Sequence, residues 1–130
     1  MLDANILIRA ILGKRVRSIL ESHAETISFL IPEEAEEQLA ALVVKRGGDP
    51  AKAVNLLRAM TGLGTIVSLD LYADFEAEAR KRRGARDPED WPILAAALSL
   101  GCPIWTEDTD FFGCGAATWT SASIDSFLTQ

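Results

Sequence analysis

The sequence predicts an α/β protein: a three-layer α/β/α sandwich in which helices cover both faces of a central, mostly parallel sheet. Two observations support this prediction. Short β-rich runs alternate along the chain with longer segments of helical character, and strand–helix–strand order of this kind builds parallel sheets. The length of 130 residues, with 48% hydrophobic and 25% charged residues, suits a single domain over residues 1–130.

The amino-terminal part is predicted to alternate strand, helix and strand. Residues 1–5 (MLDAN) read as the end of a very short strand. Residues 6–20 follow with apolar side chains such as Ile8, Ile11 and Ile19 at helical spacing. Residues 26–31 (TISFLI) form a β-rich run between polar residues, which predicts the second strand.

Two helices are predicted over residues 32–46 and 49–60. Pro32 would occupy the first helical position of the earlier one, and a glycine pair would end it. Asp49 is the predicted N-cap of the later helix, and Gly62 would close it.

The second half of the chain continues the alternation. Further strands are predicted over residues 65–69, 103–106 and 117–121. Further helices are predicted over residues 72–84, 87–101 and 123–128. Asp87 is the expected N-cap of the middle one of these helices, and Gly101 is its expected end.

Charge is distributed unevenly along the chain. The formal net charge is −6, and all thirteen Lys and Arg residues lie within the first 86 positions. An acidic protein is a poor candidate for binding nucleic acid through its overall field. Two local basic clusters remain, formed by Lys14, Arg15 and Arg17 and by Arg80, Lys81, Arg82, Arg83 and Arg86. Each cluster is either a phosphate-binding patch or a set of solvated helix ends.

Several classes of protein are disfavoured. No apolar run is long enough to span a bilayer, and no basic segment precedes an apolar stretch at the amino terminus, so we expect a cytoplasmic protein. Cys102 and Cys114 match no zinc or redox spacing. His23 is the only histidine, so a Ser-His-Asp triad or a histidine-rich zinc site would depend on it alone.

Acidic residues fall where predicted strands end or the next helices begin. Asp3 ends the first strand, Asp90 lies in the first turn of a helix, Asp108 follows residues 103–106, and Glu37 lies in the first half of a helix. Active sites of parallel sheets gather outside the carboxyl ends of the strands. Carboxylates that converge there need a counter-ion, and oxygen ligands select Mg²⁺ or Mn²⁺.

Each acid also has a structural explanation. Asp3 would cap the first helix, Glu37 would lie on the surface near a helix start, and Asp90 would complete a capping box with Asp87. Asp108 and Asp110 are natural turn residues. Taken together, however, this explanation requires four coincidences at one edge of the sheet.

The stretch RDPEDWPILAAALSLGCPIWTEDTDFFG and the opening LDANILIRAIL resemble the PIN-domain nucleases, which include VapC-like toxins of toxin–antitoxin pairs. The resemblance covers nearly the whole chain. It implies that the acidic quartet of the family corresponds to Asp3, Glu37, Asp90 and Asp108. Glu34 and Glu36 lie close enough to Glu37 to be alternatives.

The resemblance also implies the remaining roles. The four acids would be catalytic and would bind Mg²⁺ or Mn²⁺, with Asp110 as an auxiliary ligand. Asn5, Thr106 and Asp87 would not bind the metal themselves but would orient its ligands. Arg9, Lys14, Arg15, Arg82, Arg83 and Arg86 would contact the RNA backbone. The expected activity is metal-dependent endoribonuclease cleavage, with an antitoxin protein and a homodimer as expected partners.

Two other functions stay open at this point. The family's first strand usually has several apolar residues before its Asp, whereas Met1 and Leu2 alone precede Asp3 here. This departure favours a catalytically weak or inactive PIN-like binding or scaffold module. A phosphatase of the haloacid-dehalogenase kind also uses an early Asp, but it requires a second Asp where Asn5 stands.

Overall fold

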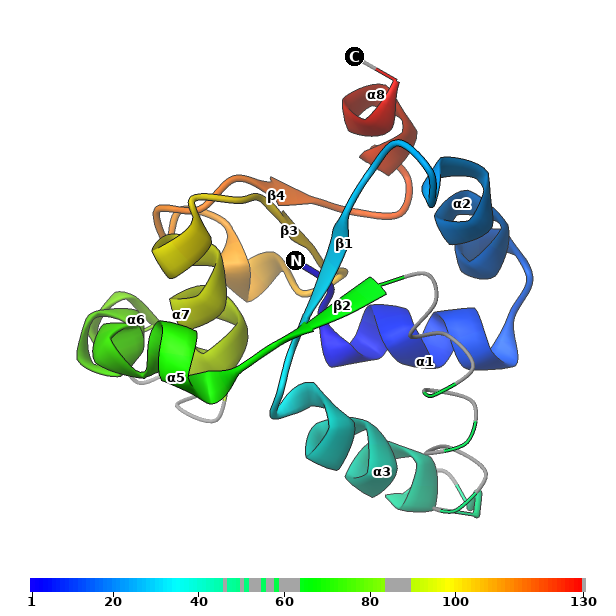
Figure 1. The fold of residues 1–130 in the computed structure, drawn as a ribbon, viewed down its shortest axis with the longest axis horizontal. Helices are drawn as coiled ribbons and strands as arrows, with labels where there is room; N and C mark the ends of the chain where they lie inside the picture. The colour runs from blue at the N-terminus through cyan, green and yellow to red at the C-terminus, as the bar shows by residue number, and fades with distance from the viewer. Residues whose placement is uncertain are drawn as a thin grey trace.

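The computed structural model describes residues 1–45, 47–49, 51, 55, 58, 64–83 and 90–129 (Figure 1). Its helices are α1 (Ala4–Leu12), α2 (Arg15–His23), α3 (Ala35–Lys45), α5 (Leu69–Tyr72), α6 (Glu76–Arg83), α7 (Trp91–Leu100) and α8 (Ile124–Leu128), with short 3₁₀ turns η1 (Ala73–Phe75) and η3 (Thr109–Phe111). Its strands are β1 (Phe29–Pro32), β2 (Gly64–Val67), β3 (Ile104–Trp105) and β4 (Thr118–Trp119).

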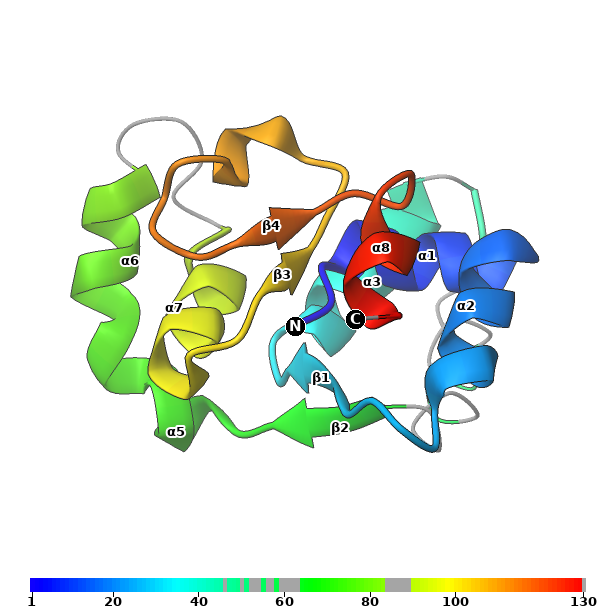
Figure 2. The ribbon, with the colours of Figure 1, turned by 90° about the horizontal axis from the view of Figure 1, so that it is seen from above.

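The amino-terminal residues join two parallel strand pairs into one sheet. β1 pairs with β2, and β3 pairs with β4. Between the pairs, the Leu2 N–H donates to the Leu30 carbonyl at 2.8 Å, and the Trp105 N–H donates to the Met1 carbonyl at 2.8 Å. Leu2 bridges Trp105 in parallel. The spatial order is therefore β2, β1, residues 1–3, β3, β4, as Figure 2 shows from above.

Side chains alternate across this sheet between two cores, as the pleat requires. Leu2, Phe29 and Trp105 pack into a core with α1, α2, α3 and α8. Met1 and Ile104, one position away in each strand, pack into a second core with α5, α6 and α7. Figure 2 shows these two groups of helices on opposite sides of the strands. The predicted α/β/α sandwich with a parallel sheet is confirmed.

The sequence predicted one continuous helix over residues 6–20, and that prediction was wrong because the structure has two separate helices there. α1 ends at Leu12 and α2 begins at Arg15. The half-buried Arg17 side chain donates to the carbonyls of Ala10 and Ile11, each at 2.9 Å. It thereby satisfies groups that a continuous helix would have bonded internally.

Two predicted helix starts were also wrong. Pro32 is the last residue of β1, and α3 begins at Ala35. Proline lacks an N–H, and the end of a strand tolerates that loss. Asp90, rather than Asp87, occupies the N-cap of α7, and Pro92 follows in its first turn. Asp87 lies outside the described residues, as does most of the predicted helix over residues 49–60.

The predicted helix over residues 72–84 was wrong in its start and continuity: helical structure begins earlier, with α5 at Leu69, and η1 separates α5 from α6. The described elements β2, β3, β4 and α8 overlap the elements predicted there. Gly101 ends α7 with a positive φ of 63°, the left-handed conformation that glycine adopts without strain. None of the helices in the described part of the chain has the length and apolar character that crossing a bilayer requires.

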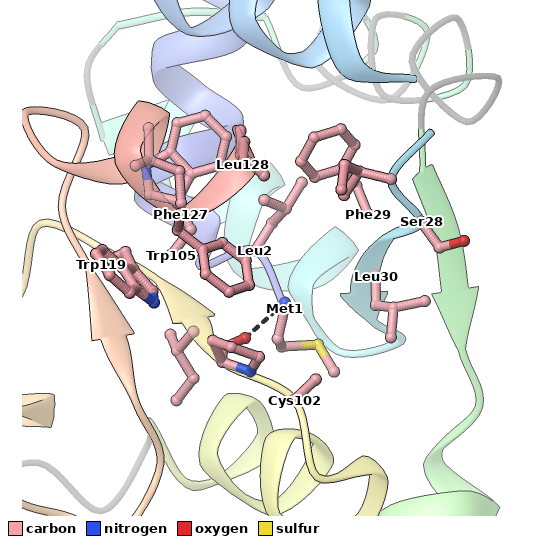
Figure 3. A pocket seen from close by; sticks show the side chains of 14 residues that line it. Met1, Leu2, Ser28, Phe29, Leu30, Cys102, Trp105, Trp119, Phe127 and Leu128 are labelled. Atoms are coloured by element: carbon pink, nitrogen blue, oxygen red, sulfur yellow. Dashed lines mark hydrogen bonds between the residues drawn. The ribbon is translucent and has the colours of Figure 1, made fainter. Parts of the chain in front are cut away.

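A pocket of about 160 Å³ lies at the amino end of the strands, between residues 27–30 and residues 102–105 (Figure 3). None of the described residues that line it has a charged side chain. At its edge the Met1 amine donates to the Pro103 carbonyl at 2.9 Å. The rings of Trp119 and Phe127 stack beside it with their centroids 5.2 Å apart. Because its lining lacks carboxylates, this pocket is not the predicted metal site.

Candidate functional site

The carboxyl ends of two adjacent strands bring Asp3, Thr106 and Asp108 together. Asp3 follows Leu2, the residue that bridges Trp105, and Thr106 follows β3. The buried Thr106 hydroxyl donates to Asp3 Oδ2 at 2.6 Å and accepts the Asp108 N–H at 3.0 Å. One hydroxyl group therefore connects the two acidic positions, which are separated by more than a hundred residues.

Burial makes the Asp3 carboxylate costly to ionise. Only 8% of the residue is exposed. Desolvation raises the pKa of Asp3, and the nearby charge of Asp108 raises it further. The Thr106 hydroxyl and the N–H groups of Ala4 and Asn5 favour the ionised form without reversing the shift. A cation beside Asp3 and Asp108 would relieve this penalty.

Asp108 begins the turn that contains Asp110. Asp108 is half-buried, and its Oδ1 accepts the Asp110 N–H at 2.9 Å, which starts η3. The turn-forming role expected of Asp108 is therefore present. A carboxylate has two oxygens, so this bond leaves Asp108 the chemical capacity to bind a cation as well. Asp110 is exposed, and its role as an auxiliary ligand stays a prediction.

Asp90 lies at the start of α7. It is half-buried, and its side chain makes no capping hydrogen bond to that helix. The next residue, Trp91, packs against Tyr72, and the Arg80 guanidinium lies 5.5 Å from the centroid of the Trp91 ring. Asp90 thus stands where α7 meets α5 and α6, and its role as a metal ligand stays a prediction.

The acids at the start of α3 differ in burial. Glu37 is exposed, whereas Glu34 is half-buried. Desolvation raises the pKa of Glu34, as do Glu37, Glu76 and Glu33, while Arg80 lowers it. Glu34 therefore faces the charged residues of α6, close to Arg80 and the start of α7. The side chain of Glu36 lies outside the described residues.

The donor set suits a hard divalent cation. Among the residues that the structure describes, no three acidic, histidine or cysteine side chains lie close enough together to hold a metal ion. Mg²⁺ is nevertheless commonly bound by one or two carboxylates, with waters and substrate phosphate oxygens completing the octahedron. Asp3 and Asp108 provide such a pair, with oxygen donors only.

Glu107 has a contact that the sequence did not predict. Glu107 is half-buried, and its Oε1 accepts the Ser121 N–H at 2.6 Å. Burial alone would raise the pKa of Glu107, but the Ser121 hydrogen bonds, together with Arg9 and Arg15, lower it overall. No local pattern could reveal a partner fourteen residues away in a loop.

The predicted RNA-contacting residues fall into two groups. Arg9, Lys14 and Arg15 are exposed on α1 and at the start of α2, and two of them influence Glu107, next to Asp108. Arg82 is exposed on α6, where it bonds Glu78 at 2.8 Å and the Cys114 carbonyl at 3.1 Å. The Arg83 side chain and the whole of Arg86 lie outside the described residues. Asn5 is exposed in the first turn of α1.

Comparison with known proteins gives one match. A family model described as PIN domain matches residues 1–129. No curated protein and no solved structure matches significantly. The match covers the strand ends that carry Asp3, Thr106 and Asp108, as well as the start of α7.

Proposed function

This chain belongs to the PIN-domain family of nucleases, and from that premise we propose that it is a metal-dependent endoribonuclease that hydrolyses RNA phosphodiester bonds. The products would carry 5′-phosphate and 3′-hydroxyl ends. The observation that supports the proposal best is the pair of acids that Thr106 joins, in which a buried Asp3 lies beside Asp108. A cation beside this pair would favour its ionised form.

The proposed metal site assigns a separate role to each of its residues. Asp3 and Asp108 would hold one Mg²⁺ or Mn²⁺, and Asp90 and an acid of α3 would complete the site. Thr106 would orient the Asp3 carboxylate through its 2.6 Å bond and the backbone of Asp108 through its 3.0 Å bond. When bound, the ion would lower the pKa of a water ligand and neutralise charge on the reacting phosphate.

Basic residues would bind the RNA beside the acidic pair. Arg9, Lys14 and Arg15 are exposed, and the charges of Arg9 and Arg15 act on Glu107, the residue before Asp108. Cationic side chains at a rim contact the phosphates and position the strand, while the carboxylates stay at the reacting bond. This separation allows a protein with a net charge of −6 to act on a polyanion.

A role as the toxin of a toxin–antitoxin pair is a further part of the proposal. A protein antitoxin would then cover the acidic pair of Asp3 and Asp108, and two copies of the toxin would form a homodimer. A small open reading frame beside the gene for this chain would support the role. Growth arrest on expression, relieved by co-expression of that neighbour, would test it directly.

One observation favours a second function, that of a catalytically weak PIN-like binding or scaffold module. The described part of the chain holds no set of three ligand side chains in position for a metal ion. A module of this kind would bind RNA or protein without cleaving either.

Cleavage of a panel of structured RNAs in Mn²⁺ separates the two functions. We expect the wild-type protein to cut, and Asp108→Asn and Asp90→Asn to lose at least a hundredfold in rate. Asp125→Asn is the matched control, because Asp125 is an exposed acid on α8. Equal cleavage by all four proteins would exclude the assigned site, and no cleavage by any of them would favour the scaffold module.

A further inference from the structure

Four consecutive residues, 105–108, are held by bonds on two sides. On one side, Trp105 Nε1 donates to Ser121 Oγ at 3.1 Å, and Glu107 Oε1 accepts the Ser121 N–H at 2.6 Å. On the other side, the Thr106 hydroxyl bonds both Asp3 and the Asp108 N–H. The side chains of Trp105 and Glu107 therefore fasten the segment to Ser121, and the Thr106 side chain connects it to Asp3.

Ser121 is a fixed anchor for this segment. It is 8% exposed and lies in the loop between β4 and α8. Its hydroxyl accepts from Trp105, its N–H donates to Glu107, and its carbonyl accepts Arg15 Nη2 at 3.3 Å. The three polar groups of one buried residue thus each contact a different side chain around the site.

We propose that Glu107 is a positioning residue of the metal centre, which fixes the backbone that presents Asp108 by bonding to the Ser121 N–H. This inference rests on the proposed metal site. Glu107 precedes Asp108 directly, so the Ser121 bond restrains the peptide that leads to the ligand. Thr106 and the turn to Asp110 restrain Asp108 from within the same segment, and the Ser121 bond adds a restraint from a distant loop. Residues that orient a metal ligand typically change metal affinity by about 10- to 100-fold when removed.

Two substitutions distinguish the effect of the length of the Glu107 side chain from the effect of its charge. Glu107→Gln keeps an oxygen at the same distance and loses the charge. Glu107→Asp keeps the charge and is one methylene too short to reach Ser121. Positioning predicts that Glu107→Gln preserves Mn²⁺ affinity within about threefold and that Glu107→Asp lowers it about tenfold, as does Glu107→Ala.

The measurement is Mn²⁺ titration calorimetry on RNA-free protein, with thermal unfolding to verify the fold of each variant. Glu33→Ala is the matched control, because Glu33 Oε2 accepts the Leu69 N–H at 2.8 Å and so makes the same kind of bond between distant segments. We expect this control to lower thermal stability and leave Mn²⁺ affinity unchanged.

The outcomes distinguish this inference from the proposed function. If the wild type binds Mn²⁺, Asp108→Asn abolishes binding, and Glu107→Asp matches the wild type, the metal site stands and the positioning role is overturned. Loss of affinity in Glu107→Gln with retention in Glu107→Asp would likewise overturn it, since charge rather than reach would matter. Absence of Mn²⁺ binding by the wild type would overturn both.

Discussion

At Asp3, the stability of the fold favours a neutral side chain, whereas the proposed function requires an ionised one. Its carboxylate is buried, adjacent to another acid, and its pKa is raised by desolvation. Function requires the ionised form, because only a carboxylate binds Mg²⁺ or Mn²⁺ well. The metal-free fold should therefore be less stable than a fold with a neutral group at this position.

We predict that Asp3→Asn raises the midpoint of thermal unfolding by a few degrees at pH 7 in the absence of metal. An acid with a raised pKa in the folded state costs no stability below its ordinary pKa of 3.8, and the cost becomes complete above the raised value. The advantage of Asp3→Asn should therefore disappear below pH 3.8. Added Mn²⁺ should stabilise only the wild type. Equal midpoints at pH 7 would show that Asp3 carries no such penalty.

Thr106 holds Asp3 and the backbone of Asp108 in place relative to each other. It is fully buried, and its hydroxyl serves Asp3 and the Asp108 N–H together. Thr106→Val keeps the shape and leaves both partners unbonded, so we expect the free energy of unfolding in urea to fall by about 1–3 kcal/mol. Thr106→Ser keeps the hydroxyl and should lose much less. Equal losses would mean that packing, rather than the hydroxyl, matters there.

At the scale of elements, the alternation of strands and helices was predictable, because short β-rich runs alternate along the chain with segments of helical spacing bounded by capping residues. The side chains of Met1 and Leu2 enter opposite cores, as do those of Ile104 and Trp105. The break between α1 and α2 was not predictable, because apolar residues keep helical spacing across it. It depends on the Arg17 side chain, whose contacts form only when the chain turns at Gly13.

The candidate site was predictable where it depends on topology alone. Parallel strands end at the same edge, so Asp3 and the residues after β3 had to meet. The choice between Glu34 and Glu37 depends on the rotation of α3, which a helical pattern of modest amphipathicity does not fix. Glu107 and Ser121 meet through a loop, and no sequence period relates them.

We predict that Arg17→Met lowers the free energy of unfolding by about 1.5–3 kcal/mol, the range for hydrogen bonds to a charged group. The substitution removes both bonds to the last carbonyls of α1. Lys14→Met is the control, because Lys14 is an exposed cation three residues earlier. Urea unfolding measures both. A loss of the same size in Lys14→Met would attribute the effect to charge and not to the cap.

At the scale of the whole molecule, an acidic chain has to bind RNA through a local basic surface. We predict that replacing Arg9 and Lys14 by Ala weakens binding of all single-stranded RNAs alike and reduces the slope of log affinity against log salt by about 0.7 per lost phosphate contact. Binding should be measured in EDTA to prevent cleavage. An unchanged slope would place the RNA on another surface, such as that around Arg82.

The central claim is that Asp3 and Asp108 hold a divalent ion together. Anomalous X-ray scattering from crystals soaked in Mn²⁺ tests it most directly. The account predicts one strong peak about 2.1 Å from a carboxylate oxygen of each residue, and no peak at this position in Asp108→Asn crystals. A Mn²⁺ peak elsewhere on the protein, with both carboxylates unbound, would contradict the account, and so would well-ordered wild-type crystals without a peak.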